Sequence, residues 1–219
     1  TVAPEQQDAG DFIRKCAQQG IVVALGHHNS SAAQIKSAAD NGAALSTHLG
    51  NGCANMINRH ENVLWPQLAE DRLMISIIAD GFHLRPEEVT TFYKAKRVHR
   101  VILVSDMTKF AGMPAGRYSW LDTEIEVTPA GKIVNVGQNN LAGASFPITR
   151  GIDNVMEFTG CPLSEAIDMA TVNSAKLLGL TYRGEVKPGK RADLMVFGFE
   201  GGELVVYKTY VGEIGRAHV

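Results

Sequence analysis

The sequence has few cysteines, few aromatic residues, no excess of either charge and no long apolar run. Its 219 residues include 3 cysteines and 7% aromatic residues, with a formal net charge of -2. Cys16, Cys53 and Cys161 lie far apart and form no C-x-x-C pair, which argues against a disulfide framework and a cysteine zinc site. The balanced charge argues against a nucleic-acid-binding protein, and 45% hydrophobic residues argue against a disordered chain.

The chain also lacks the run of roughly 20 apolar residues that crosses a bilayer, and its N-terminus has no signal-like apolar core. We therefore expect no membrane partner and, from the cysteine usage, a cytoplasmic protein. The opening Thr1-Val2-Ala3-Pro4-Glu5 is typical of a strand that runs into a loop, and no initiator Met precedes it. We expect a fragment: a truncated reading frame, a proteolytic product or a chain without its N-terminal half.

What the sequence does contain is a series of short apolar runs, each followed by polar residues and then by a helical pattern. The runs cover residues 21–25, 43–45, 74–79 and 101–104. Continuous apolar runs of this length are typical of strands that are buried on both faces. Strands that alternate with helices predict right-handed βαβ units and a parallel sheet, either closed into a barrel or open and doubly wound.

Helix signals separate the runs. Asn29, Ser30 and Ser31 are candidate N-caps for a helix over residues 32–40, which Asn41-Gly42 ends. A second helix is expected over residues 63–70. A third begins near Pro86, because the fixed φ of proline suits the first helical turn.

The pattern changes after Asp106. Turn sequences around an alternating segment at 123–127 predict antiparallel hairpins. Helical patterns return, with Asn173 as the expected cap of the last one; they cover residues 147–158, 163–171 and 175–178. Glycine- and proline-rich turns then separate three expected strands, over residues 192–199, 203–207 and 210–214.

Four residues with ligand or acid–base chemistry follow the apolar runs directly: His27, His48, His83 and Asp106. Active residues gather at the carboxyl ends of parallel strands. Neutral imidazole is a good zinc ligand, so His27 and His48 are the candidate metal pair. Asp106 is a candidate third ligand or general base for a metal-bound water. The alternative is structural: hydrogen-bonded strand-end histidines and a turn or N-cap aspartate.

Other polar residues carry weaker signals. Arg59 suits a phosphate group, which a guanidinium binds with paired hydrogen bonds, or it is a solvated surface residue. Residues 139–145 offer backbone N–H groups to an anion or form a tight turn. The remaining histidines are assigned to structure or surface: His28, His60, His99 and His218.

Seven short motifs stand in a fixed order along the chain. They are Ala3-Pro4-Glu5, Gly26-His27-His28-Asn29, Thr47-His48-Leu49-Gly50-Asn51, Asp80-Gly81-Phe82-His83, Leu103-Val104-Ser105-Asp106, Leu141-Ala142-Gly143-Ala144-Ser145 and Pro188-Gly189-Lys190-Arg191-Ala192-Asp193-Leu194. Together they resemble the amidohydrolase superfamily and, within it, the family of N-acetylglucosamine-6-phosphate deacetylases. The resemblance implies an α/β fold with the later strands of a (β/α)8 TIM-type barrel over residues 1–180. It also implies a hairpin insertion at about 112–138, and C-terminal strands of a small β domain over 181–219.

The resemblance also implies a role for each candidate residue. His27 and His48 would bind a divalent metal, most often Zn²⁺, and Asp106 would take a proton from the attacking water and pass it to the leaving amine. His83 would contact the substrate and help to polarise the acetyl carbonyl. Arg59 would meet the sugar phosphate and, in this family, can do so across a dimer interface. Further substrate contacts, largely through backbone groups, are implied for Asn51, Gly52, Ala142 and Gly143.

The implied reaction is hydrolysis of the N-acetyl group of N-acetylglucosamine 6-phosphate, a small sugar phosphate, by a homodimer. Zinc lowers the pKa of bound water from about 15.7 to about 7, and one carboxylate can act first as base and then as acid. Two alternatives stay open. One is an amidohydrolase for another N-acyl substrate, such as N-acetylgalactosamine 6-phosphate or an N-acyl amino acid. The other is a catalytically silent half-barrel scaffold.

The sequence departs from the family pattern in several places, one of which is Met107 after Asp106 where the family usually has Ala. Relatives carry an H-x-H and an H-L-E-G-P stretch before the first motif, whereas this chain starts after both. His27 and His48 alone leave zinc short of the three protein ligands expected at a catalytic site. In addition, Gly50-Asn51-Gly52 replaces an aromatic-Asn-Ala pattern.

Overall fold

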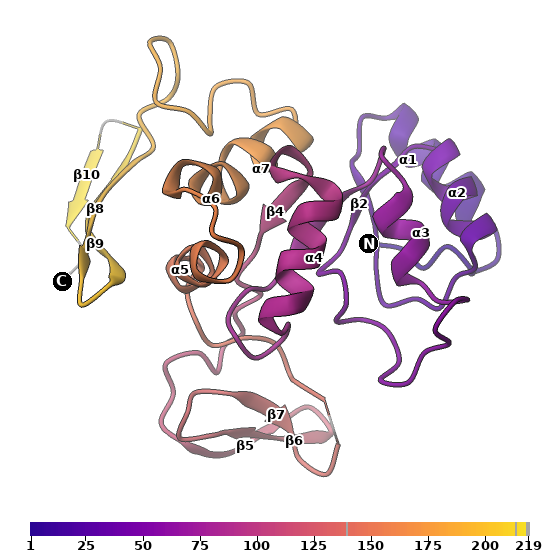
Figure 1. Cartoon of the computed structure of the whole chain (residues 1–219), viewed down its shortest axis with the longest axis horizontal. Coiled ribbons are helices and arrows are strands. Elements are labelled where there is room, and N and C mark those ends of the chain that lie inside the picture. Colours follow the sequence, from indigo (N-terminus) through magenta and orange to yellow (C-terminus); the bar gives the residue numbers. More distant parts are fainter. Residues whose placement is uncertain (139, 213, 218–219) are drawn as a thin grey trace.

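The computed structural model describes residues 1–138, 140–212 and 214–217 of the chain. A parallel sheet with helices packed around it forms the centre, and two small antiparallel sheets lie at its margins (Figure 1). Within the described residues, no helix is both long enough and apolar enough to cross a membrane.

The four apolar runs form the parallel sheet. Its strands, in spatial order, are β1 (Val23–Leu25), β2 (Ala43–Ser46), β3 (Met74–Ile77) and β4 (Val101–Leu103). The predicted parallel arrangement is therefore confirmed. The first strand begins two residues later than expected, because Ile21 is 52% exposed and lies outside the ladder.

Helices connect these strands, as the alternating pattern predicts. They are α2 (Ala32–Asp40), α3 (Leu64–Ala69), α4 (Pro86–Lys96) and the single turn η1 (Val98–Arg100), and a further helix, α1 (Ala9–Gln18), precedes β1. α2 has the predicted bounds, and its N-cap is Ser31. The Ser31 side chain accepts a bond from the Gln34 N–H, and the Gln34 side chain accepts one from the Ser31 N–H. α1 is a helix that the sequence analysis missed.

A second group of helices follows the hairpin region: α5 (Ile148–Thr159), α6 (Leu163–Ala170) and α7 (Val172–Leu177). The prediction that Asn173 caps a helix is wrong, because it lies inside α7 and is 1% exposed. Its side-chain amide donates to the carbonyl oxygens of Val98 and Val101, each at 2.7 Å. Asn173 thus ties α7 to the start of β4.

Two antiparallel sheets complete the fold. One contains β5 (Gly116–Trp120), β6 (Thr123–Val127) and β7 (Ile133–Asn135); the other contains β8 (Leu194–Glu200), β9 (Glu203–Val211) and β10 (Ile214–Ala217). The first confirms the predicted hairpins. The second corrects the expected strands, since residues 203–207 and 210–211 belong to the single strand β9, which Gly212 ends at a positive φ. His218 lies outside the described residues.

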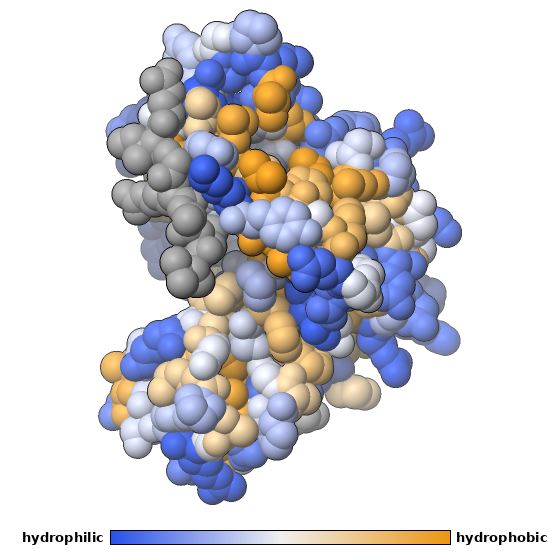
Figure 2. Space-filling model, turned by 90° about the vertical axis from the view of Figure 1, so that its left-hand side faces the viewer, coloured by the Kyte–Doolittle hydropathy of each residue, from blue (hydrophilic) through white to orange (hydrophobic). Residues whose placement is uncertain are grey.

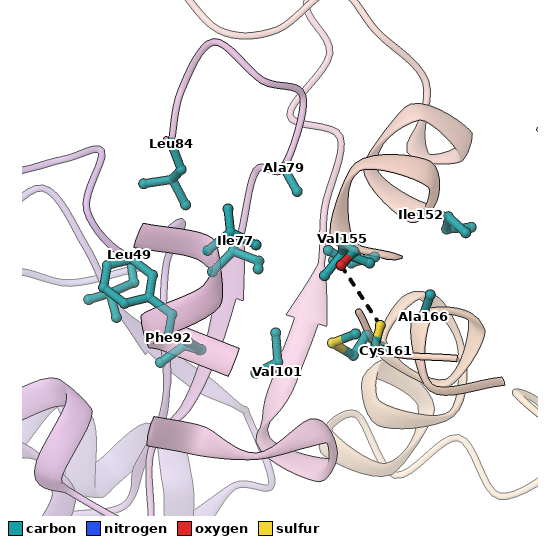
Figure 3. Close-up of a cluster of buried hydrophobic side chains, with 14 of the residues drawn as sticks. Leu49, Ile77, Ala79, Leu84, Phe92, Val101, Ile152, Val155, Cys161 and Ala166 are labelled. Atoms are coloured by element: carbon teal, nitrogen blue, oxygen red, sulfur yellow. Dashed lines mark hydrogen bonds between the residues drawn. The ribbon is translucent and has the colours of Figure 1, made fainter. Parts of the chain in front are cut away.

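The larger hydrophobic core lies between the parallel sheet and the helices α4 to α6. Ile77 and Val101 of the sheet lie between Phe92 of α4 and the α5 and α6 residues Val155 and Ala166 (Figure 3). All five side chains are buried. This packing holds β3 and β4, and therefore the loops that follow them, in one rigid unit.

The sheet of β5–β7 forms a separate lobe. In Figure 2 it lies below the rest of the chain and joins it through a narrower waist. Its own small core consists of Phe110, Ile125, Val127 and Ile133. The other antiparallel sheet packs on α5, where the N–H of Leu204 donates to the Asp153 carboxylate at 3.0 Å. β8 carries exposed apolar side chains, including Val196 and Phe199.

Lys96, at the end of α4, is a fully buried amine. Its Nζ donates to the carbonyl oxygens of Glu70 (2.6 Å) and Leu73 (2.9 Å), which lie before β3. Burial, assisted by the nearby Arg100 charge, lowers the pKa of Lys96 from 10.5 to about 8. At pH values between about 8 and 10.5, Lys96 carries a proton in the unfolded chain but not in the folded chain.

Stability should therefore rise with pH in that window because of Lys96. We expect the free energy of unfolding to increase by at most about 2 kcal/mol between pH 8 and pH 10, measured by urea unfolding. Lys96→Met should remove this increase, whereas Lys94→Met, at an exposed position of the same helix, should keep it. Equal pH dependence in both variants would contradict the assignment.

Candidate active site

Strained backbone turns lie at the ends of three strands of the parallel sheet. His27 follows β1, His48 follows β2 and Asp106 follows β4, with φ values of 53°, 30° and 52°. Positive φ is uncommon outside glycine and persists only where the surroundings enforce it. Three of the four strand-end residues with ligand or acid–base chemistry thus leave the strand direction, and His83 is the exception.

His27 and His48 face each other. Their Nε2 atoms lie 2.9 Å apart, and the rings meet edge to face with centroids 4.8 Å apart. The N–H of His48 donates to Oγ of Ser76 at 2.7 Å, which fixes its turn to the neighbouring strand β3. Burial lowers the pKa of His48, so its imidazole is neutral at pH 7.

This pair fits a divalent metal. Two imidazoles that point their Nε2 atoms at one location are donors that suit zinc, and each would bind it at about 2.0–2.1 Å. No group of three His, Cys, Asp or Glu side chains in the described part of the chain could hold a metal ion. The described residues therefore offer two candidate ligands, one fewer than the three expected at a catalytic zinc site.

His83, after β3, is held by Asp80. Oδ2 of Asp80 lies 2.8 Å from Nδ1 of His83, and Oδ1 accepts bonds from the N–H groups of Phe82 and His83, both at 2.9 Å. Both side chains are 6% exposed. Burial alone would raise the pKa of Asp80, but the bonds from His83 and Phe82 outweigh burial and hold it below its usual value. An ionised Asp80 thus occupies Nδ1 and leaves Nε2 as the free nitrogen of the ring.

Asp106 is exposed, and its backbone is paired with the loop 141–145. The N–H of Ala144 donates to the Asp106 carbonyl at 2.9 Å, and the N–H of Thr108 donates to the Ala144 carbonyl at 3.0 Å. Gly143 has a φ of 77°, and a Cβ there would lie 2.2 Å from the Thr108 methyl group. Only glycine therefore lets this loop close over Asp106.

The loop after His48 is fixed to both histidines. The N–H and the side-chain Nδ2 of Asn51 both donate to the His48 carbonyl, at 3.0 and 3.2 Å. A Cβ at Gly52 would lie 2.9 Å from the backbone nitrogen of His27. The small residue at 52 lets the loop approach the first histidine closely.

A pocket of about 800 Å³ brings most of the predicted site residues together. The residues of its wall are His27, His48, Gly50, Asn51, Gly52, Cys53, Ala54, Asn55, Ile57, Leu64, Ile78, Phe82, His83, Glu88, Asp106, Asn140, Leu141 and Gly143. Two predicted residues are absent from this wall. Arg59 is exposed in the loop before α3, and Ala142 packs on the core of the β5–β7 lobe, where its N–H donates to Ile133 at 3.0 Å.

The sequence analysis assigned no role to two residues that support the site, Asp80 and Ser76. A carboxylate three residues before a strand-end histidine was the available signal for Asp80. For Ser76, the signal was one hydroxyl inside an otherwise apolar run. The assignment of His28 to structure agrees with its buried ring, whose Nδ1 accepts a bond from the Ser30 N–H at 3.3 Å.

Comparison with known proteins assigns the chain to a protein family. The model of the Amidohydrolase family matches residues 4–212, and the chain belongs to that family. The N-acetylgalactosamine-6-phosphate deacetylase of Escherichia coli O157:H7 is 33% identical over 195 residues, which cover 89% of this chain and 51% of that protein. The N-acetylglucosamine-6-phosphate deacetylase of Bacillus subtilis is 31% identical over 197 residues, which cover 90% and 49%.

Solved structures agree with these relatives. The N-acetylglucosamine-6-phosphate deacetylase of Pasteurella multocida has a TM-score of 0.89 at 26% identity, over 99% of this chain and 56% of that one. A mutant of the Mycobacterium smegmatis enzyme in complex with N-acetyl-D-glucosamine-6-phosphate has a TM-score of 0.88 at 28% identity, over 98% and 56%. The predicted α/β fold, a partial barrel with a small β domain, is confirmed. The chain spans about half the length of the curated relatives it matches.

The Asp80 carboxylate yields a prediction about stability. Asp80→Asn should cost about 1–3 kcal/mol at pH 7, because a buried carboxylate that accepts several hydrogen bonds is lost. The folded pKa of Asp80 lies below the usual 3.8, so its contribution is present above pH 4 and is lost as the pH falls further. Urea unfolding at pH 7, 5 and 3 measures this difference from the unmodified chain.

Asp122→Asn is the matched control, because Asp122 is exposed at the turn between β5 and β6. It should change the unfolding free energy by less than about 0.5 kcal/mol. A loss in Asp80→Asn that equals the loss in Asp122→Asn would show that the carboxylate of Asp80 does not fix this loop. A loss of stability in Asp80→Asn that stays constant down to pH 3 would lead to the same conclusion.

Proposed function

We propose that this chain forms the metal-binding and proton-transfer side of a deacetylase that hydrolyses N-acetylglucosamine 6-phosphate to glucosamine 6-phosphate and acetate. The observation that carries the proposal is the facing pair of His27 and His48 Nε2 atoms, 2.9 Å apart, on the pocket that Asp106 and His83 also line. The names of the relatives supply the substrate class. The activity of the whole protein, its zinc, its cytoplasmic location and a homodimer are parts of this proposal.

In this mechanism His27 and His48 hold the metal. When bound, zinc would lower the pKa of the water that attacks the acyl group. The exposed carboxylate of Asp106 would accept a proton from the attacking water and pass it to the amide nitrogen. Proton transfer is needed because an amine leaves poorly unless it is protonated. His83 contacts the acyl oxygen through Nε2, the ring nitrogen that the Asp80 carboxylate leaves free.

The substrate would be oriented by the loops that close the pocket. Asn51, Gly52 and Gly143 line the pocket wall and offer backbone groups to the sugar. Ala142 can contribute only its carbonyl group, because its N–H is bonded to Ile133. We further propose that residues 1–180 are the barrel part, with an insertion at about 112–138, and that 181–219 belong to the small β domain.

A second candidate substrate is N-acetylgalactosamine 6-phosphate, which the name of the Escherichia coli relative at 33% identity favours. The two sugars differ only in the orientation of one hydroxyl group, so the same metal, base and phosphate contacts serve both. A direct comparison of kcat/KM for the two phosphorylated sugars decides between them.

Acetate release tests the proposed reaction. We expect turnover when this chain is supplied with zinc and co-expressed with the N-terminal half of the Bacillus subtilis relative, since the described residues supply only two metal ligands. Asp106→Asn should lower kcat by a factor on the order of 10² to 10⁴, the usual contribution of a positioned acid–base group.

The substrate panel contains both phosphorylated sugars, unphosphorylated N-acetylglucosamine and an N-acetyl amino acid. Turnover of the phosphorylated sugars alone would support the proposal. Turnover of the amino acid instead would move the substrate to another N-acyl class. No turnover of any of them by folded, zinc-loaded protein would favour the silent scaffold.

Arg59 is the proposed phosphate ligand, although it is exposed and does not line the pocket of its own chain. Arg59→Ala should raise KM for phosphorylated substrates by roughly tenfold or more and leave kcat nearly unchanged. Arg14→Ala, on the exposed face of α1, is the control and should change neither.

A dimer explains how Arg59 could reach a phosphate. If it acts on the neighbouring subunit, a mixture of Arg59→Ala and Asp106→Asn chains should regain activity, because one site of each mixed dimer has both groups. An equal effect of Arg59→Ala on phosphorylated and unphosphorylated substrates would exclude the phosphate role.

A further inference from the structure

The first five residues of the chain are bound to the backbone on both sides of His27. On the side of β1, the N–H of Val2 donates to the Ala24 carbonyl at 2.9 Å, and the N–H of Gly26 donates to the Val2 carbonyl at 3.2 Å. Val2 thereby forms a parallel bridge with Leu25. This pairing fixes the residue that immediately precedes His27.

Glu5 fixes the residues that follow it. Its Oε1 accepts a bond from the Asn29 N–H at 2.9 Å, and its Oε2 accepts one from the Ser30 hydroxyl. Ser30 is 3% exposed, and its own N–H donates to Nδ1 of the buried His28 ring. Burial would raise the pKa of Glu5, but the bonds from Ser30 and Asn29 outweigh it and hold the pKa below its usual value.

His27 therefore lies between two sets of hydrogen bonds, one made by Val2 and one by Glu5, and we call each set a tether. It also has a φ of 53°, a backbone conformation that a non-glycine residue adopts only under constraint. Its Nε2, 2.9 Å from that of His48, must stay on the same side of the pocket for the two rings to share one metal. Release of either tether would let the turn relax and the ring swing away.

We propose that Glu5 is a positioning residue for the metal ligand His27, which it orients through the backbone of Asn29 and the side chain of Ser30. The inference rests on the proposed role of His27 and His48 as metal ligands. Glu5 does not touch the metal or the substrate in this account. Its effect is to keep a strained turn in the one conformation that aims the imidazole at its partner.

Zinc affinity of the full 219-residue chain, measured by competition with a chromophoric chelator, tests the proposal. Glu5→Ala should weaken zinc binding roughly tenfold, the low end of what indirect support of a ligand contributes. Glu5→Gln should restore affinity to within about threefold of the unmodified chain. The glutamine oxygen can accept from Asn29, and its amide can donate to the Ser30 hydroxyl. Ser30→Ala, which removes one of the two bonds, should give an intermediate loss.

A control substitution at Ser31, next to Ser30, distinguishes the positioning of His27 by Glu5 from a general effect on stability. Ser31→Ala removes the N-cap of α2, one residue beyond the tether, and should lower the thermal midpoint without changing zinc affinity. All affinities are compared at a temperature where circular dichroism shows each variant to be folded.

The outcomes separate this inference from the proposed function. His27→Ala and His48→Ala should each lower zinc affinity; if neither does, or if the unmodified chain binds no zinc, the metal-site proposal fails and this inference fails with it. If both histidine variants lose zinc while Glu5→Ala keeps it, only the positioning role of Glu5 is overturned. The positioning role of Glu5 is also overturned if Glu5→Ala and Ser31→Ala lose zinc affinity equally.

Discussion

The candidate site depends on the strained turns at the carboxyl ends of neighbouring parallel strands. A parallel sheet brings its strand ends to one edge, but a side chain in regular strand geometry points to one face or the other. The positive φ values of His27, His48 and Asp106 break that geometry at the last residues before the loops. The buried sheet and its helices keep these turns in place, because the core around Ile77 and Val101 allows little movement of β3 and β4.

Hydrogen bonds from neighbouring segments of the chain hold the turns after His48 and Asp106 in this conformation. Ser76 binds the N–H of His48 from the next strand, and Ala144 binds the Asp106 carbonyl from a loop that only Gly143 allows to close. His83 has its own anchor in the buried carboxylate of Asp80. His48, Asp106 and His83 therefore each have a partner that fixes their position, which is the condition for catalytic groups to meet one substrate.

Much of the fold could be predicted because its signals are local. Continuous apolar runs gave the parallel sheet, and the bounds of α2 followed from its capping residues. α1 was missed although its buried residues Ala9 and Ile13 stand at helical spacing. The role of Asn173 could not be predicted, since its partners lie more than seventy residues away in sequence. The candidate site shows the same division. His27 and Asp106 could be predicted from their position at strand ends. The location of a loop residue could not, because it depends on contacts that no local pattern encodes.

The central claim is that His27 and His48 bind one metal ion. Anomalous diffraction at the zinc absorption edge, from crystals of the zinc-loaded chain, tests it most directly. The account predicts one strong peak at about 2.0–2.1 Å from Nε2 of both histidines, which disappears in crystals of His48→Ala. A zinc ion bound elsewhere, or no peak between the two rings in well-ordered crystals soaked with zinc, would contradict it.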